Sequence, residues 1–281
     1  MDMSTVEARR AILKAEYHRL EHYLHTLSPE AWQHPTPCAQ WTVADVIAHL
    51  TAGNNNHAAW ITEALRAERT PEHLPRRSRH RVDAAAVAHR VMALRHELGP
   101  DLLSAFVAST RAIAHAFAQV ALDDWETLCY RPNGAEPLRT ILDNFIAEAG
   151  VHRWDVMVPF DPHVQLSPEG AAVMVERYPH RPRWWDIALP SQHPPLPVRF
   201  RFAVSGVTAP GTDFVVATPD EQYMEATGEA PAQVTFHCEA QTFVLLAYGR
   251  LSPVSARATG LLTAEGSQAW AEMFLRGYSG G

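Results

Sequence analysis

The chain has 281 residues, enough for two domains of ordinary size, and its 47% apolar and 20% charged residues are normal for a globular protein with a substantial core. A formal net charge of −7 excludes a global basic field that would hold nucleic acid or an anionic membrane. Because no stretch of about 18 uncharged apolar residues occurs, and because the N-terminal sequence turns charged at once, unlike a signal peptide, we expect a cytoplasmic protein without a transmembrane helix.

Apolar residues at helical spacing predict a helical first half. The long helices are expected at residues 5–27, 42–65, 82–98, 101–122 and 138–157, with a further helix start at Ser28-Pro29-Glu30. The helix that begins at Thr42 has Asp45 three residues on, which predicts a capping box. We interpret the arginine-rich segment 66–81 as a solvated loop, and the alternative is a mobile basic flap over an anionic substrate.

The character of the sequence changes near Pro159. Residues 159–170 are typical of a linker that leads into a helix capped by Ser167, and the alternation in VRFRFAV predicts a half-buried strand. Further strands are expected at 213–218 and 233–238, and helices at 241–248 and 264–276. We therefore predict a two-domain α+β fold, with a helical bundle over residues 1–160 and a smaller α+β domain over residues 161–281.

The chain contains three cysteines, Cys38, Cys129 and Cys238, which lie far apart. They form no CxxC pair and no disulfide framework, as suits a reducing compartment. We interpret each of them as a small buried hydrophobic residue. Only Cys38 lies close to a motif that carries chemistry.

The most informative predicted helix is the one that contains ILDNFIAEAGVHRWDV. Ile141, Phe145, Glu148 and His152 share one stripe of it, and the two apolar members mark that stripe as facing the core. Two ionisable groups there need partners. Either they satisfy each other as a carboxylate–imidazole pair, or they bind a metal together, since residues four apart on a helix can converge on one ion.

His49 favours the metal site. It lies in the apolar part of the helix that starts at Thr42, with Asn56 and Trp60 on the same face. Facing helices of a bundle are common places for buried metal sites, and two histidines with one carboxylate leave the open position of a catalytic centre. The alternative is a core histidine that is hydrogen-bonded to a backbone carbonyl, which a sequence with 16 histidines keeps open.

Two motifs carry a family resemblance. PTPCAQWTVADVIAHLTAG, followed about a hundred residues later by EAGVHRWDV, resembles the DinB-like metalloenzymes, and within them the mycothiol-dependent maleylpyruvate isomerase family. The resemblance implies that His49, Glu148 and His152 bind a divalent metal in a four-helix bundle. It also implies a C-terminal α+β domain like a sterol-carrier module.

The resemblance further implies that an arginine of the C-terminal domain handles the substrate. FVLLAYGR resembles the family's apolar helix ending in Gly-Arg, which makes Arg250 the first candidate, while Arg199, Arg201 and Arg257 remain open. The alternative role for Arg250 is a cap at a helix C-terminus.

The chemistry follows from the open coordination position. A free thiol is mostly protonated at neutral pH, whereas a metal-bound thiol is deprotonated. We expect mycothiol to be activated at His49, Glu148 and His152, and to attack a small electrophile in an isomerisation or an S-transfer. Asn56 and Trp60 are expected to line the thiol pocket. Asp155 is expected either to orient an imidazole or to pair with Arg153.

Two other functions are compatible with the same residues. One is a metal-dependent hydrolase with water in the open position, and the other is a non-catalytic protein that binds metal and ligand. Zinc suits two imidazoles and a carboxylate best, while nickel, iron and cobalt also accept them. We expect small-molecule partners, no nucleic acid or membrane, and a monomer or homodimer.

Overall fold

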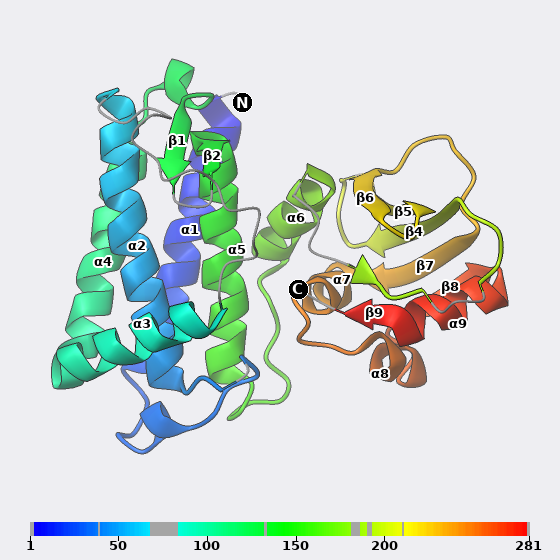
Figure 1. The fold of residues 1–281 in the computed structure, drawn as a ribbon. Coiled ribbons are helices and arrows are strands. Elements are labelled where there is room, and N and C mark those ends of the chain that lie inside the picture. The colour runs from blue at the N-terminus through cyan, green and yellow to red at the C-terminus, as the bar shows by residue number, and fades with distance from the viewer. Residues whose placement is uncertain are drawn as a thin grey trace. The chain divides into compact units, whose positions relative to one another are not determined.

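The computed structural model describes residues 3–38, 40–67, 84–131, 134–180, 186–189, 193–209 and 211–279. The chain divides into two compact units, Met1–Val164 and Gln165–Gly281 (Figure 1). The division falls close to the boundary that the sequence placed after residue 160. Apart from Arg66 and Ala67, the segment interpreted as a loop or flap at 66–81 lies outside the described residues.

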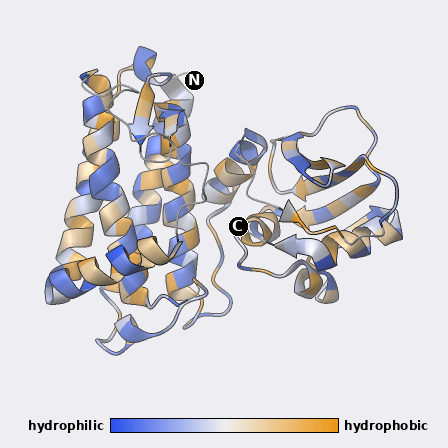
Figure 2. Cartoon of the chain, viewed as in Figure 1, coloured by the Kyte–Doolittle hydropathy of each residue, from blue (hydrophilic) through white to orange (hydrophobic). Residues whose placement is uncertain are grey.

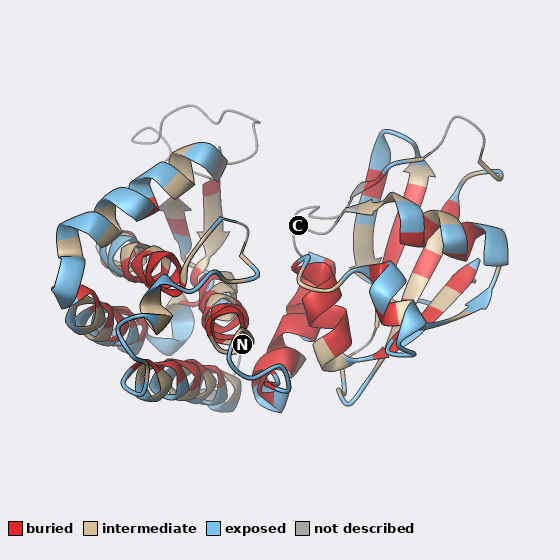
Figure 3. Ribbon diagram, turned by 90° about the horizontal axis from the view of Figure 1, so that it is seen from below, coloured by how far each residue is buried: buried red, intermediate tan, exposed pale blue. Residues whose placement is uncertain are grey.

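Unit 1 is a bundle of helices. They are α1 (Met3–Leu24), α2 (Val43–Leu65), α3 (Ala84–Leu98), α4 (Leu102–Ala118) and α5 (Leu138–Met157). α2 packs on α3, α4 and α5, and α1 packs on α4 and α5. Figure 3 shows the result, with buried sides of the helices facing one another and exposed sides facing outward.

Short elements of unit 1 depart from the prediction. The start at Ser28 yields only a single 3-10 turn, Ala31–Gln33. Helix α4 ends at Ala118, and a further 3-10 turn follows at Leu122–Asp124. A hairpin of β1 (Leu128–Arg131) and β2 (Gly134–Pro137) precedes α5, and it was not predicted. Strands of four residues are too short to produce a readable alternation.

The N-terminus of α2 is fixed by the capping box that the sequence predicts. The Thr42 side chain accepts from the backbone N–H of Asp45, and the Asp45 carboxylate accepts from the backbone N–H of Thr42. Arg95 of α3 adds an ion pair of 3.1 Å to the same carboxylate. These capping interactions fix the residue at which α2 starts, and they thereby fix the position of His49 along the helix.

Unit 2 is built on one sheet in the order β6-β5-β4-β7-β8, in which β4 and β7 are parallel and the other pairs are antiparallel. Its strands are β4 (Val198–Ser205), β5 (Thr212–Thr218), β6 (Glu221–Ala226), β7 (Val234–Glu239) and β8 (Thr263–Gly266). Its helices are α6 (Pro168–Arg177), α7 (Ala240–Ala247), α8 (Pro253–Ala258) and α9 (Gln268–Gly277), and a short ladder joins β3 (Asp186–Ile187) to β9 (Tyr278–Ser279). Blue and orange alternate along its strands in Figure 2.

The core of unit 2 is aromatic. Phe200, Phe202 and Phe236 of the sheet pack against Phe274 of α9, with ring centroids 4.8–5.6 Å apart. The period-two pattern predicted the inward face of β4 correctly, since Val198, Phe200 and Phe202 are buried.

The predicted helix at 264–276 is wrong in its first part. Residues Thr263–Gly266 form β8, and α9 begins only at Gln268. Gly266 has a positive φ of 96°, which ends the strand, and the Ser267 side chain accepts from the backbone N–H of Trp270 as the cap of α9. Strand β6 was also missed, because its sequence EQYMEA is too polar to show a clear apolar face.

None of the helices in the described part of the chain combines the length and the apolar character that crossing a bilayer requires.

Replacing Thr42 with alanine tests the capping box. The substitution removes the acceptor for the Asp45 N–H, and we expect the free energy of unfolding to fall by about 1 kcal/mol. Urea denaturation followed by circular dichroism measures this change. Thr62→Ala is the matched control, because Thr62 lies inside α2 and only bonds back to Ala58; an equal loss in both variants would contradict a capping role.

Candidate metal centre

Three side chains from α2 and α5 converge in unit 1. His49 lies on α2, and Glu148 and His152 lie one turn apart on α5. Glu148 Oε2 lies 3.4 Å from His49 Nε2 and 3.3 Å from His152 Nε2. The two imidazole rings are 5.1 Å apart at their centroids and nearly perpendicular, at 74°. The structure thus brings together the three residues that the sequence singled out as metal ligands.

The spacing of the three donor atoms fits a metal ion. A tetrahedral ion with bonds of about 2.0–2.1 Å separates its ligand atoms by roughly 3.4 Å. The two measured separations of 3.3 and 3.4 Å match that value, and all three donor atoms lie within 4.8 Å of one another. The donor set and its geometry therefore suit zinc or a similar divalent cation.

The charges of the group are also arranged for a cation. Burial raises the pKa of Glu148, but hydrogen bonds and charge interactions with His152 and His49 outweigh it and hold the pKa well below its ordinary value. Burial lowers the pKa of His152, but hydrogen bonds of the ring with Asp155, Cys38 and Glu148 outweigh it and hold the pKa well above its ordinary value. The group thus contains an ionised carboxylate and an imidazole that holds a proton strongly. A divalent cation could replace that proton as the positive charge beside Glu148.

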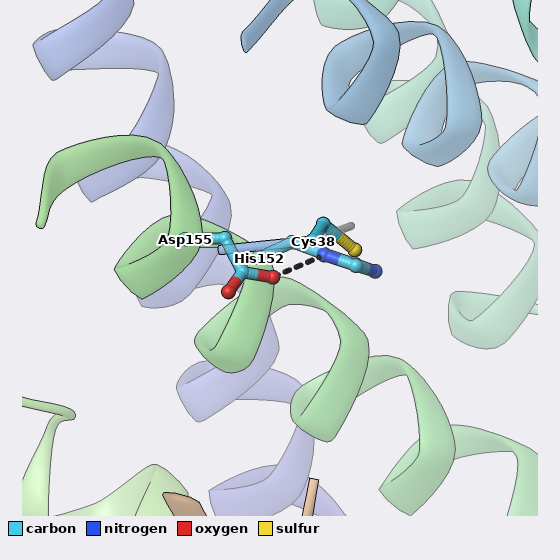
Figure 4. A group of neighbouring side chains, drawn as sticks. All are labelled: Cys38, His152 and Asp155. Carbon is cyan, nitrogen blue, oxygen red and sulfur yellow. Dashed lines mark hydrogen bonds and ion pairs between the residues drawn. The ribbon is translucent and has the colours of Figure 1, made fainter. Parts of the chain in front are cut away.

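Asp155 orients the His152 ring. Its Oδ2 lies 2.9 Å from His152 Nδ1, and its side chain is fully buried. Figure 4 draws this interaction as a dashed line. A carboxylate that accepts from Nδ1–H fixes the tautomer and leaves Nε2 free to face a metal. Arg153, the alternative partner considered for Asp155, forms an ion pair with the buried Glu16 at 2.9 Å.

The segment before α2 supplies two neighbours that the sequence did not identify. The backbone N–H of Trp41 donates to the carbonyl of Cys38, and the carbonyl of Trp41 accepts from the backbone N–H of Thr36. This turn places the Trp41 indole against His49, with centroids 4.9 Å apart, and the Cys38 thiol beside His152. The interpretation of Cys38 as a buried hydrophobic residue is wrong, since Cys38 is only half-buried.

Asn54, not Asn56, is the buried asparagine of α2. Asn56 is exposed, which contradicts its expected inward position, while Asn54 is fully buried. Asn54 accepts from the Tyr17 hydroxyl at 2.5 Å and donates to Ser109 Oγ at 3.1 Å, and so links α1, α2 and α4. Residues two apart on an α-helix lie about 200° apart around its axis, so the two asparagines lie on nearly opposite sides of α2. Asn56 shares the side of His49, whose side chain is itself 29% exposed, and that side therefore does not face the core at Asn56.

Trp60 belongs to an aromatic group farther along α2. Its ring contacts His57 at 4.7 Å, and His57 packs edge-on against Phe145 at 4.9 Å, one turn before Glu148. His57 Nδ1 donates to the carbonyl of Gly53, and Arg131 of the hairpin lies 3.4 Å from Nε2. Burial, aided by the charge of Arg131, lowers the pKa of His57 to about 4, so the ring is neutral at neutral pH.

The arginine candidates all belong to unit 2. Arg250 follows the end of α7. The backbone N–H of Gly249, which has a φ of 66°, donates to the carbonyl of Leu246, and the backbone N–H of Arg250 donates to the carbonyl of Leu245. Its side chain donates to the carbonyl of Tyr248 at 2.7 Å, in line with the helix-end alternative. A role of Arg250 toward the ligands of unit 1 stays a proposal.

The other three arginines differ in their contacts. Arg199 and Arg201 of β4 both pair with the fully buried Asp213, at 3.0 and 2.9 Å, which gives them a structural role in the sheet. Arg257 lies on α8, and its buried Nη1 has no hydrogen-bond partner among the described residues. It therefore remains open as a substrate contact.

Comparisons with known proteins agree with this architecture. A family model described as the mycothiol maleylpyruvate isomerase N-terminal domain matches residues 13–157. Two proteins of Mycobacterium tuberculosis are each 37% identical over 59 residues, which is 21% of this chain and 31% of each relative. They are "Uncharacterized protein MT0763" of strain CDC 1551 / Oshkosh and "Uncharacterized protein Rv0738" of strain ATCC 25618 / H37Rv. The match thus spans about a third of the length of these curated relatives.

Two solved structures share the fold along most of the chain. The crystal structure of the mycothiol-dependent maleylpyruvate isomerase has a TM-score of 0.58 at 15% identity and covers 92% of both chains. A histidine-to-alanine mutant of that isomerase has a TM-score of 0.56 at 14% identity, again with 92% of both chains covered. At these identities the likeness shows the fold, in which a helical N-terminal part precedes a C-terminal part that contains a sheet.

The pKa of His57 predicts a pH dependence of stability. An unfolded histidine takes up a proton near pH 6.5, whereas His57 in the folded state does so only near 4. The neutral His57 ring therefore contributes fully to the free energy of unfolding above about pH 6.5, and this contribution is lost as the pH falls toward 4. Urea denaturation between these values should show a shallower decline for His57→Gln than for the wild type. The exposed His89→Gln is the control, and parallel curves for wild type and His57→Gln would contradict the assignment.

Proposed function

The chain belongs to the family of the mycothiol maleylpyruvate isomerase N-terminal domain, and from that premise we propose that it is a metal- and thiol-dependent enzyme acting on a small electrophile. The observation that carries the proposal is the convergence of His49, Glu148 and His152 at the spacing of a tetrahedral ligand set. Metal dependence and thiol activation are both part of the proposal.

The three ligands would hold one divalent metal, most suitably zinc, with nickel, iron and cobalt as alternatives. His152 would bind through Nε2, because Asp155 holds Nδ1. When bound, the ion supplies a means of converting a thiol to its thiolate near neutral pH. Glu148 balances one positive charge and so keeps the loaded site able to accept an anionic sulfur.

The chain's own residues decide from which side a thiol enters. The side chains of His49 and Glu148 are 29% and 36% exposed, whereas that of His152 is 9% exposed. An external ligand therefore reaches the group past His49 and Glu148. Trp41 covers the His49 ring and limits its contact with water. Trp60 and the neighbouring His57 are candidates for the wall of the thiol pocket, and Asn56, being exposed, is proposed only for the rim.

Mycothiol is the thiol that the family name suggests, and a cis–trans isomerisation of a maleylpyruvate-type substrate is the first reaction to test. In that reaction the thiolate adds to a conjugated double bond, the bond rotates, and elimination returns the thiol. Transfer of the thiol to the electrophile is the second candidate, because the same activated sulfur serves both. Arg250 is proposed as the residue of unit 2 that binds the substrate.

The reaction can be tested with zinc-loaded protein, mycothiol and maleylpyruvate, followed by proton NMR of the olefinic hydrogens. Conversion that requires both zinc and mycothiol supports the isomerase, and a stable thiol adduct found by mass spectrometry supports the transferase. Zinc-dependent formation of a hydrolysis product without mycothiol would instead indicate a metal-dependent hydrolase. If a panel of electrophiles gives no conversion and no adduct, the protein only binds metal and ligand.

Metal content tests the ligand set directly. We expect His49→Ala to lose most of its zinc, because one of three ligands is removed. Glu148→Gln should keep the fold and bind zinc more weakly, since it keeps the size of the side chain and loses the charge. Elemental analysis after gel filtration gives the stoichiometry. His89→Ala, on the exposed side of α3, is the control; normal zinc content in His49→Ala would refute the assignment.

Replacing Arg250 with alanine tests the role of unit 2. We expect Arg250→Ala to retain the zinc stoichiometry of the wild type and to lose turnover, with the loss expressed in KM if the guanidinium binds an anionic substrate. Arg276→Ala is the matched control, because Arg276 is an exposed arginine near the end of another helix of the same unit. Unchanged kinetics in Arg250→Ala would restrict Arg250 to capping α7.

A further inference from the structure

The Cys38 thiol is part of a second donor group that shares His152 with the first. Cys38, His152 and Asp155 each offer a ligand atom within 4.8 Å of the other two. Figure 4 shows the three side chains, with a dashed line that joins the Asp155 carboxylate to His152. The proposed function uses His152 and Asp155, but it gives no role to the sulfur.

The backbone around Cys38 holds the thiol in place. Its N–H donates to Thr36 Oγ1 at 3.2 Å, and its carbonyl accepts from the backbone N–H of Trp41 at 2.9 Å. Trp41 in turn packs on His49. The same turn thus places the Cys38 thiol near His152 and the Trp41 indole against His49. The backbone that holds Cys38 is therefore tied to two of the three candidate ligands.

The other two cysteines differ from Cys38. Cys129 and Cys238 are both buried, and burial raises the pKa of Cys238 to about 12. Cys38 is half-buried and lies beside a metal-binding histidine, so it alone among the three combines access with a neighbouring ligand. A thiolate is also a softer ligand than a carboxylate and suits zinc.

We propose that Cys38 is an internal sulfur ligand of the metal, which binds together with His49, Glu148 and His152 when no external thiol is present and is displaced when one enters. This inference rests on the proposed function. The Cys38 sulfur lies in the donor group of His152 and Asp155, and not in that of His49 and Glu148. Binding to the metal would therefore require the Cys38 side chain to move toward His49 and Glu148, and the bond to the ion would stabilise the moved position.

The exchange conserves charge and protons. The internal ligand is a thiolate, and the entering molecule is a thiol. The proton of the entering thiol passes to the Cys38 sulfur as one metal–sulfur bond breaks and the other forms. The site would therefore keep the same net charge before and after exchange. His49, Glu148, His152 and Cys38 would together hold the metal when no external thiol is present, and Cys38 would be the replaceable member.

Cobalt-substituted protein tests the proposal, because a sulfur ligand produces a near-ultraviolet charge-transfer band while the visible bands report bound cobalt. The protein is kept reduced with a phosphine so that no thiol is added. We expect the charge-transfer band in the wild type and its loss in Cys38→Ser and Cys38→Ala, with cobalt affinity lowered at least ~10-fold. Adding mycothiol should restore the band in both variants.

Cys129→Ala is the matched control and should keep the band. Visible cobalt bands without a charge-transfer band in the wild type would overturn the role of Cys38, as would a band that persists in both Cys38 variants. Circular dichroism establishes that the variants are folded. If the wild type binds no cobalt at all, the metal-dependent function itself fails, so the two failures are distinguishable.

Discussion

One carboxylate shared between two imidazoles is the interaction on which the rest of unit 1 depends. Glu148 lies 3.4 Å from His49 and 3.3 Å from His152, and the first contact joins residues 99 positions apart in the chain. Ionised groups inside a helical bundle destabilise it unless each has a partner. The register between α2 and α5 is therefore constrained by charge as well as by apolar packing.

Two further groups of contacts support the helices around the carboxylate. Asn54 joins Tyr17 to Ser109 in the buried interior, and the charge of Glu148 adds to the effect of burial in raising the pKa of Tyr17, so the phenol stays neutral as a hydrogen-bond donor. In the second group Phe145 packs between His57 and Phe117. A slip of α5 by one turn would break the contacts of Glu148 with His49 and the ring contacts of Phe145 together, whereas the Asn54 group would hold α1, α2 and α4 in place.

The sequence predicted the parts of this site that are periodic and missed the parts that depend on irregular backbone. Glu148 and His152 follow the apolar stripe of α5, and the Thr42–Asp45 box fixes the start of the helix that carries His49, so all three candidate ligands were accessible to pattern reasoning. The positions of Cys38 and Trp41 depend on a turn with a positive φ of 68° at Gln40, for which a non-glycine sequence gives no signal. The short hairpin and β8 were missed for a different reason, because strands of four residues carry too little alternation of apolar and polar side chains.

The unequal exposure of the three candidate ligands bears on whether the proposed site performs catalysis. A structural zinc site is closed by four permanent protein ligands, whereas a catalytic one keeps a position that an external molecule can take. Here the buried member, His152, is fixed from behind by Asp155, while His49 and Glu148 are open to the side from which a ligand arrives. A cysteine at the edge of this arrangement is suited to reversible ligation, because its backbone is held by the turn and only its side chain has to move. The rigid ligands would then keep the metal, and the exchangeable sulfur would keep the remaining position available to a thiol.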